Sequence, residues 1–220
     1  MADGMICRRG GGAASGGQIG AFLDGTITEI SDASVTSMRG SYLFDGCSYL
    51  TSISLPALST FPGAMPFSSM TPNLETATFG VTAIAGTYFL SCTKLREVNL
   101  PNCVWIASSA FKQCTSLATI SMPSLRSIYQ DAFRSAALTT ASFPSCSMIS
   151  GYAFGNCSSL RSLYLMGSVV PSLAVTAFYM TPLIESTFGG YGSIYIPASM
   201  YDSYMASYTW NQLSSRIVGV

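Results

Sequence analysis

The sequence predicts a mainly β solenoid, in which one short parallel strand stacks on the next in every coil of about 22 residues. Two observations predict this fold class. Phenylalanine recurs at successive steps of 23, 22, 22, 22, 21 and 24 residues, and each copy is followed by a short run with the spacing of a β strand. One such run cannot bury its own apolar side. About seven stacked runs can, with neighbouring strands about 4.8 Å apart.

The phenylalanine of each coil marks the beginning of its repeat, and Phe22 lies one further step of 22 residues upstream. The seven repeating residues are Phe44, Phe67, Phe89, Phe111, Phe133, Phe154 and Phe178. Three residues later each coil has a small or soft residue: Cys47, Met70, Cys92, Cys114, Ala136, Cys157 and Thr181. Exchange among cysteine, methionine and alanine is typical of a buried apolar position. We therefore expect the phenylalanines to form one aromatic column inside the solenoid.

The strand of each coil has the pattern Leu-x-x-Ile-x-Leu, and proline usually follows it. The Ile-x-Leu alternation places both apolar side chains on one side of the strand. Proline then ends the strand, because it has no N–H group for a longer ladder. The runs begin at Leu50, Leu74, Leu95, Leu117, Leu138 and Leu160, and a displaced version is Ile194-x-Ile196-Pro197.

A second apolar pair, with its members three residues apart, recurs in every coil. The pairs are Val35/Met38, Leu58/Phe61, Val81/Ile84, Cys103/Ile106, Leu125/Ile128, Cys146/Ile149 and Val170/Leu173. The coil that begins at Phe133 is one residue short, and the last coil carries an insertion around Ser186–Gly192.

The two ends of the chain differ from the repeats. Residues 1–20 do not repeat and are rich in glycine, which predicts either an attachment arm or a disordered end. The segment Ala198–Arg216 spaces its apolar residues near helical intervals, which predicts a capping helix. The predicted organisation is therefore an arm at 1–20, a solenoid at 21–197 and a helical cap at 198–220.

The repeat F-x-x-C-x-x-L-x-x-I-x-L-P resembles the BspA-type bacterial leucine-rich repeat over about residues 22–197. The C-terminal tail from Ile194 onward also resembles the closing segment of such proteins. The resemblance implies a leucine-rich repeat solenoid. It also implies a function among bacterial surface adhesins or proteins carried in phage and prophage genomes.

Composition excludes several functions. Charged residues make up 9% of the chain, and ten basic residues balance ten acidic ones, which argues against nucleic acid or an anionic membrane as a partner. The chain has no histidine, so it lacks the commonest general base and most zinc sites. No apolar run reaches the roughly 18 residues of a membrane-spanning helix. We expect no enzyme activity, no cofactor and no metal.

The cysteines, tryptophans and glutamates also fit the expectation that the chain has no enzyme activity. The cysteines of the repeats (Cys47, Cys92, Cys103, Cys114, Cys146 and Cys157) occupy apolar positions of the pattern and are expected to be free thiols, and Trp105 and Trp210 are expected to pack. Glycosidase chemistry needs two facing acids, whereas the glutamates are scattered over different coils and only Glu97 is expected to point outward from a strand.

The outward strand positions form the candidate binding surface, the expected concave sheet of the solenoid. It consists almost entirely of hydroxyl side chains, with two tyrosines near its C-terminal end, and would suit a sugar. The alternative is that serine and threonine merely tolerate a solvated strand. The candidate residues are Glu97, Asn99, Thr119, Ser121, Thr140, Ser142, Ser162, Tyr164, Ser193 and Tyr195.

No export signal or C-terminal anchor is recognisable in the sequence. We therefore expect a phage virion-associated protein, a tail or decoration component assembled in the host cytoplasm, which contacts the host surface. Its partner would be a protein or glycan on a cell surface, and residues 1–20 would attach to another virion protein. The alternative is a bacterial cell-surface adhesin.

Overall fold

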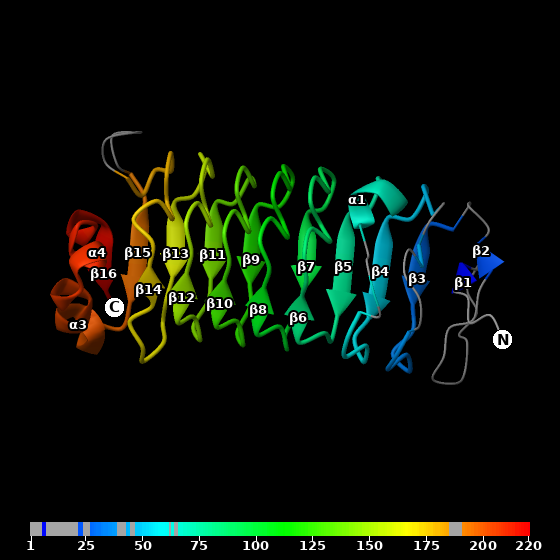
Figure 1. The fold of residues 1–220 in the computed structure, drawn as a ribbon, viewed down its shortest axis with the longest axis horizontal. Coiled ribbons are helices and arrows are strands. Elements are labelled where there is room, and N and C mark those ends of the chain that lie inside the picture. The colour runs from blue at the N-terminus through cyan, green and yellow to red at the C-terminus, as the bar shows by residue number, and fades with distance from the viewer. Residues whose placement is uncertain are drawn as a thin grey trace.

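The structure is a computed structural model that describes residues 27–38, 43–44, 47–61, 63, 66–184 and 191–220. It also describes the backbone of two short parallel strands, β1 (Ile6–Cys7) and β2 (Phe22–Leu23). The rest of the predicted arm at 1–20, the side chain of Phe22 and most of the insertion at 186–192 lie outside the described residues. Successive coils follow one another along the long axis of the molecule (Figure 1).

The predicted strand of each coil is confirmed, and all pairs between these strands are parallel. In the register, Ala141 lies between Ile120 and Leu163, so equivalent repeat positions are neighbours. The strands are β3 (Glu29–Ser31), β4 (Ser52–Leu55), β5 (Thr76–Phe79), β7 (Glu97–Asn99), β9 (Thr119–Ser121), β11 (Thr140–Ser142), β13 (Ser162–Tyr164) and β15 (Ser193–Ile196).

Each central coil also has a second strand, which corrects the prediction of one strand per coil. The two-residue strands are β6 (Ala83–Ile84), β8 (Trp105–Ile106), β10 (Ser127–Ile128), β12 (Met148–Ile149) and β14 (Ser172–Leu173), and they form one continuous parallel sheet. Their inward residues come from the second apolar pair of the repeat. A strand of two residues is too short to show the alternation from which a strand is recognised in sequence.

The aromatic column is confirmed from Phe44 to Phe178. Consecutive ring centroids lie 4.7 to 5.5 Å apart, and every pair beyond Phe67 is stacked. All seven rings are at most 2% exposed. The small residue three positions after each phenylalanine is buried as well. These columns make a single continuous apolar core along the solenoid.

The backbone N–H groups of five of the phenylalanines, Phe67, Phe89, Phe111, Phe133 and Phe154, donate to a carbonyl of the following coil. The N–H of Phe111 donates to the carbonyl of Ala132 at 2.7 Å, and the N–H of Phe133 donates to the carbonyl of Ala153 at 2.8 Å. The residues two positions before and after Phe111, Ser109 and Gln113, both have φ of 62°. Eight described residues other than glycine adopt this left-handed conformation, among them Ser91, Ser109 and Ser135 but also Tyr152 and Met180.

The C-terminal segment is helical, as predicted, but it is divided into short pieces. It consists of η1 (Ala198–Met200), α3 (Tyr201–Ala206), α4 (Tyr208–Asn211) and η2 (Ser214–Arg216), followed by β16 (Ile217–Gly219), which pairs with β15 and was not predicted. Ser207 is extended and separates the two α-helices. These helices lie at the C-terminal end of the rod (Figure 1). A further short helix, α1 (Phe67–Met70), lies near the other end.

Trp210 packs against the end of the aromatic column, as expected. Its ring lies 6.3 Å from that of Phe178, and its indole N–H donates to the carbonyl of Pro171 at 2.6 Å. Trp210 and Tyr204 are both fully buried. Together with the helices that carry them, they separate the last coil of the core from solvent.

Candidate binding surface on the strand sheet

The outward side chains of β7, β9, β11, β13 and β15 form two rows, which we call the strand face. Neighbours in the register make the first row, Thr119, Thr140, Ser162 and Ser193, and the second row, Ser121, Ser142, Tyr164 and Tyr195. Glu97 and Asn99 continue the two rows on β7, where they pair with residues of β5. All ten candidate residues thus point outward from successive strands of the solenoid, and their inward neighbours are buried.

The strand face is not hydrogen-bonded continuously. One ladder joins β3, β4, β5 and β7, and another joins β9, β11, β13, β15 and β16, but no pairing links β7 to β9. The second sheet continues across the same coils through β6, β8 and β10. The interruption is therefore confined to the strand face.

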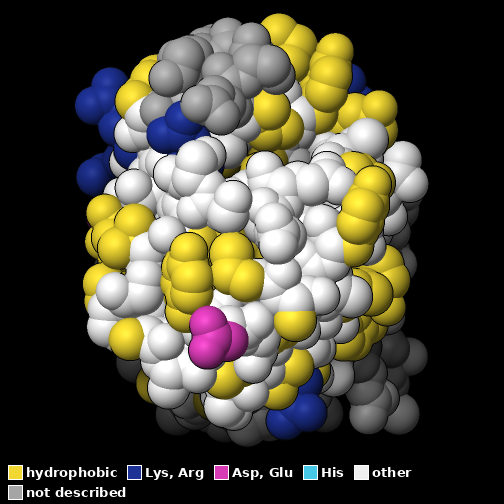
Figure 2. Space-filling view, turned by 90° about the vertical axis from the view of Figure 1, so that its left-hand side faces the viewer, with side chains coloured by type: hydrophobic (Ala, Val, Ile, Leu, Met, Phe, Trp, Pro, Cys, Tyr) yellow, Lys and Arg dark blue, Asp and Glu magenta, His cyan; other side chains and the backbone are white. Residues whose placement is uncertain are grey.

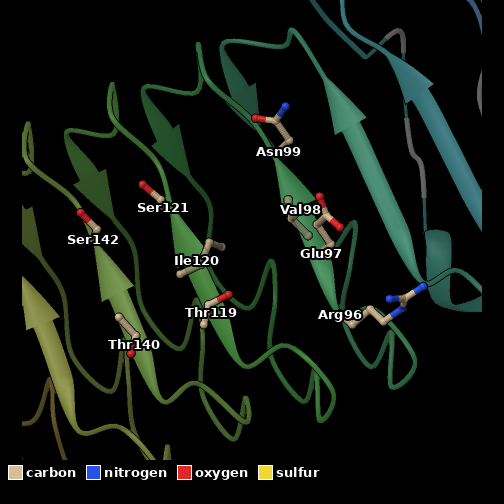
Figure 3. A pocket seen from close by; sticks show the side chains of 9 residues that line it. All are labelled: Arg96, Glu97, Val98, Asn99, Thr119, Ile120, Ser121, Thr140 and Ser142. Atoms are coloured by element: carbon tan, nitrogen blue, oxygen red, sulfur yellow. The ribbon is translucent and has the colours of Figure 1, made fainter.

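A hollow of about 380 Å³ lies on the strand face at this interruption. Figure 3 shows outward side chains of β7, β9 and β11 around it. Its lining residues are Arg96, Glu97, Val98, Asn99, Thr119, Ile120, Ser121, Thr140 and Ser142. Six of the ten predicted site residues are in this set. The sequence predicted these residues but not the hollow, because backbone pairing leaves no mark on side-chain identity.

Two charged side chains line the hollow, and only one of them forms an ion pair within the described part of the chain. Arg96 forms an ion pair with Glu75 of the preceding coil at 3.0 Å. The carboxylate of Glu97 has neither an ion pair nor a hydrogen bond within the described part of the chain. The other lining residues are uncharged, so the hollow offers hydrogen-bonding groups, one carboxylate and the two apolar residues Val98 and Ile120.

Two tyrosines lie beyond the hollow in the second row. The rings of Tyr164 and Tyr195 are stacked, with centroids 4.7 Å apart and an interplanar angle of 13°. The neighbour of Tyr164 on the other side in the register is Ser142, whose side chain is small. The predicted tyrosine pair is therefore brought together, although it is separate from the hollow lining.

The prediction that Glu97 alone among the glutamates points outward from a strand is wrong. Glu29 also points outward, on β3, in the same row as Glu97, so Glu97 is not alone in facing out from a strand. The repeat pattern missed Glu29 because its strand precedes the first phenylalanine of the aligned series. The two glutamates are three strands apart, about 14 Å at the usual strand spacing, which exceeds the separation in a glycosidase pair. Glu185 lies outside the described residues.

The cysteines are interior residues rather than reactive ones. Free buried thiols are found at Cys92, Cys103, Cys114, Cys146 and Cys157. Burial raises the pKa of Cys92 and of Cys157 from 9.0 to about 12, so these thiols stay protonated at neutral pH. The Cys157 thiol donates to the carbonyl of Phe133 at 3.0 Å, which ties two coils together.

Trp105 differs from the expectation that it packs. It is 39% exposed on the outer side of the second sheet and forms an edge contact with Tyr129, with ring centroids 6.3 Å apart. Its position follows from alternation, because Ile106 points inward and the residue before it must point outward.

The described residues contain no helix long and apolar enough to cross a membrane. They also contain no cluster of three or more histidine, cysteine, aspartate or glutamate side chains that could hold a metal ion.

The fold and the strand face define a repeat protein of the parallel β-solenoid class with one largely uncharged, hydroxyl-rich sheet surface. The family model described as "BspA type Leucine rich repeat region" matches in six copies over residues 19–124 and 82–204, and the chain belongs to this family. A comparison with curated proteins gave no match.

Two solved structures are similar to this chain. One is a structure of the Toll–Spatzle complex, described as a hub in Drosophila development and innate immunity, with 16% identity, a TM-score of 0.48, and coverage of 80% of this chain and 25% of that one. The other is a leucine-rich repeat protein from Bacteroides ovatus, with 17% identity, a TM-score of 0.37, and coverage of 77% and 55%. The chain thus spans about a quarter and about half of the lengths of these two proteins.

Proposed function

We propose that this protein is a non-enzymatic recognition module that binds a protein or glycan on a cell surface through the strand face. The observation that carries the proposal is the two rows of outward side chains, which combine a hollow of about 380 Å³ with the stacked Tyr164–Tyr195 pair. Solenoids commonly bind partners on such an extended sheet surface. Tyrosine supplies large contact area at low cost in side-chain entropy.

The chemistry of the described side chains favours binding over catalysis. The outward glutamates are too far apart to act as a pair, and burial keeps the thiols protonated. The chain has no histidine to act as a general base. The strand face can therefore form many hydrogen bonds but offers no activated nucleophile or acid–base pair.

We further propose that the module is carried by a phage virion, as a tail or decoration component, with residues 1–20 as its attachment segment, residues 21–197 as the solenoid and residues 198–220 as its cap. The free buried thiols support a protein that folds in a reducing cytoplasm before release, because disulfides accumulate in oxidising compartments. The alternative, a bacterial cell-surface adhesin, is supported by the family to which the chain belongs.

Immunogold electron microscopy of a lysate of the source would test the carrier. Label on free particles is the expected result. Label on the cell envelope would contradict the virion proposal and support the adhesin.

A paired variant tests the strand face. Tyr164→Ser with Tyr195→Ser should reduce adsorption of the purified protein to host cells at least about tenfold, since a stacked aromatic pair on a binding surface is a typical energetic centre. The matched control is Tyr201→Ser with Tyr208→Ser, two exposed tyrosines on the cap helices. Equal adsorption by both double variants would contradict the proposal.

A further inference from the structure

We propose that the ligand of the strand face is a neutral glycan chain, which occupies the hollow between β7 and β9 and extends across the strands to Tyr164. This inference rests on the proposed function and specifies its ligand class and its site. The volume of the hollow, about 380 Å³, lies within the range of about 300–1,000 Å³ that is usual for ligand sites.

The first argument is that the hydrogen-bonding groups around the hollow are unused. The side chains of Thr119, Ser121, Thr140 and Ser142, together with Asn99, form no hydrogen bond within the described chain. A hydroxyl both donates and accepts, and the amide of Asn99 offers two donors and one acceptor. The hollow therefore presents many donors and acceptors that can pair with a ligand.

Some hydroxyls elsewhere on the solenoid form hydrogen bonds between neighbouring coils. Thr51, Thr139 and Ser145 each donate to a backbone carbonyl of the preceding coil, at 2.6 to 3.0 Å. On the outward side of β4 and β5, Thr76 donates to Ser52 at 2.8 Å. Ser54, Thr78, Ser162 and Ser193, which also point outward from their strands, likewise form no side-chain hydrogen bond within the described chain. The hollow is therefore part of a longer run of free hydroxyls, which a ligand longer than the hollow can contact.

The second argument is charge. The basic side chain in the lining, Arg96, is paired with Glu75, and the unpaired charge is the carboxylate of Glu97. A phosphate or another anion would meet that carboxylate without a free cation to offset it. A neutral ligand meets no such charge repulsion, and Glu97 can accept hydrogen bonds from the hydroxyl groups of the ligand.

The third argument is the shape of the apolar contact. A bound peptide strand places side chains in apolar pockets, whereas seven of the nine lining residues are polar and the other two, Val98 and Ile120, are only 9% and 5% exposed. A sugar chain instead needs hydroxyl partners and a flat aromatic ring. Tyr164 provides such a ring two strands from β9, about 10 Å away at the usual spacing, with only Ser142 beside it on that side. The ligand must therefore be longer than a single sugar to use both parts of the site.

The test uses the full-length protein and the cells that adsorb it. Periodate, which cleaves sugar diols, should abolish adsorption, and protease treatment of the cells should leave it unchanged. Raising the ionic strength from about 0.01 M to about 1 M should change adsorption less than about twofold, because screening does not affect a neutral ligand. Loss after protease alone, or a steep loss with salt, would overturn the neutral glycan and leave the strand face as the binding surface.

Variants locate the ligand in the hollow. Thr119→Val with Thr140→Val keeps the branched shape of both side chains and removes two hydroxyls, so affinity for the cells should fall at least about tenfold. The control pair, Thr82→Val with Thr93→Val, changes exposed threonines outside the strand face and should have no effect. If the Thr119/Thr140 pair adsorbs normally while the Tyr164/Tyr195 pair does not, the hollow is not the site. If neither change affects adsorption, the proposed function itself fails.

Discussion

Replacing Phe111 by alanine would remove one ring from the middle of the aromatic column. Phe111 is fully buried, and its ring stacks on Phe89 at 5.0 Å and on Phe133 at 5.4 Å. The coils on both sides contact each other through this ring, so the deletion leaves a cavity that backbone movement cannot easily close. The stacked strands and the hydrogen bonds beside the ring hold the spacing of the coils.

The expected loss of unfolding free energy is about 3–5 kcal/mol, the usual cost of truncating a buried phenylalanine to alanine. The two ring contacts contribute about 0.5–1.5 kcal/mol each beyond the buried area, which places this site toward the upper end. In a chain of this size each kcal/mol lowers Tm by about 2–4 °C, so Tm should fall by about 6–20 °C. The Tm of Phe111→Leu should lie between those of the wild type and Phe111→Ala, because leucine restores apolar volume without the ring contacts.

Thermal unfolding followed by circular dichroism would measure this shift. The control is Tyr49→Ala, which removes an aromatic ring that is 61% exposed and should change the unfolding free energy by less than about 0.5 kcal/mol. A Tm that falls by under about one degree for Phe111→Ala would mean that the column does not stabilise the fold, and the repeat register would be wrong.

Three further predictions concern the core and its cap. Gly80→Ala should cost about 1–3 kcal/mol in a chemical denaturation experiment, because the new methyl group would overlap the backbone carbonyl of Pro56; an unchanged midpoint would contradict this. Trp210→Phe should cost about 1–3 kcal/mol, because it leaves the carbonyl of Pro171 buried without its donor, and a loss no larger than that of an exposed substitution would argue against the hydrogen bond. Stability should also fall as pH rises above about 9, because the folded state raises the pKa of Cys157 to about 12 and so holds a proton that the unfolded thiol loses. Denaturation midpoints at pH about 8 and about 10 would measure this fall, Cys157→Ala should reduce it, and an identical pH dependence in that variant would refute the assignment.

The repeat predicted the interior of the protein closely because each interior position is constrained in every coil. Phenylalanine at one position and a small residue three places later both follow from stacking equivalent side chains at a fixed spacing. The same reasoning placed all ten candidate residues at outward positions of their strands, since alternation along a strand is strict.

Features that depend on backbone pairing were not predictable in this way. The second strands contain two residues each, and the interruption between β7 and β9 occurs where the repeat itself is regular. The cap was predicted as one helix, because its apolar spacing is nearly helical, but extended Ser207 divides it. Glu29 escaped the pattern for a different reason, because its strand precedes the first phenylalanine of the aligned series.

Because the solenoid is built from whole coils, the distance between two equivalent positions on its surface is a whole multiple of the strand spacing. The hollow at β7 and β9 and the ring of Tyr164 on β13 are separated by a fixed number of coils, each of which adds about 4.8 Å. Gain or loss of one repeat between the hollow and Tyr164 would leave the core intact and change the distance between them by one strand spacing. The length of ligand that fits the proposed binding surface can therefore change only in steps of one coil, and a repeat array can acquire a preference for another ligand length without a change in any single side chain.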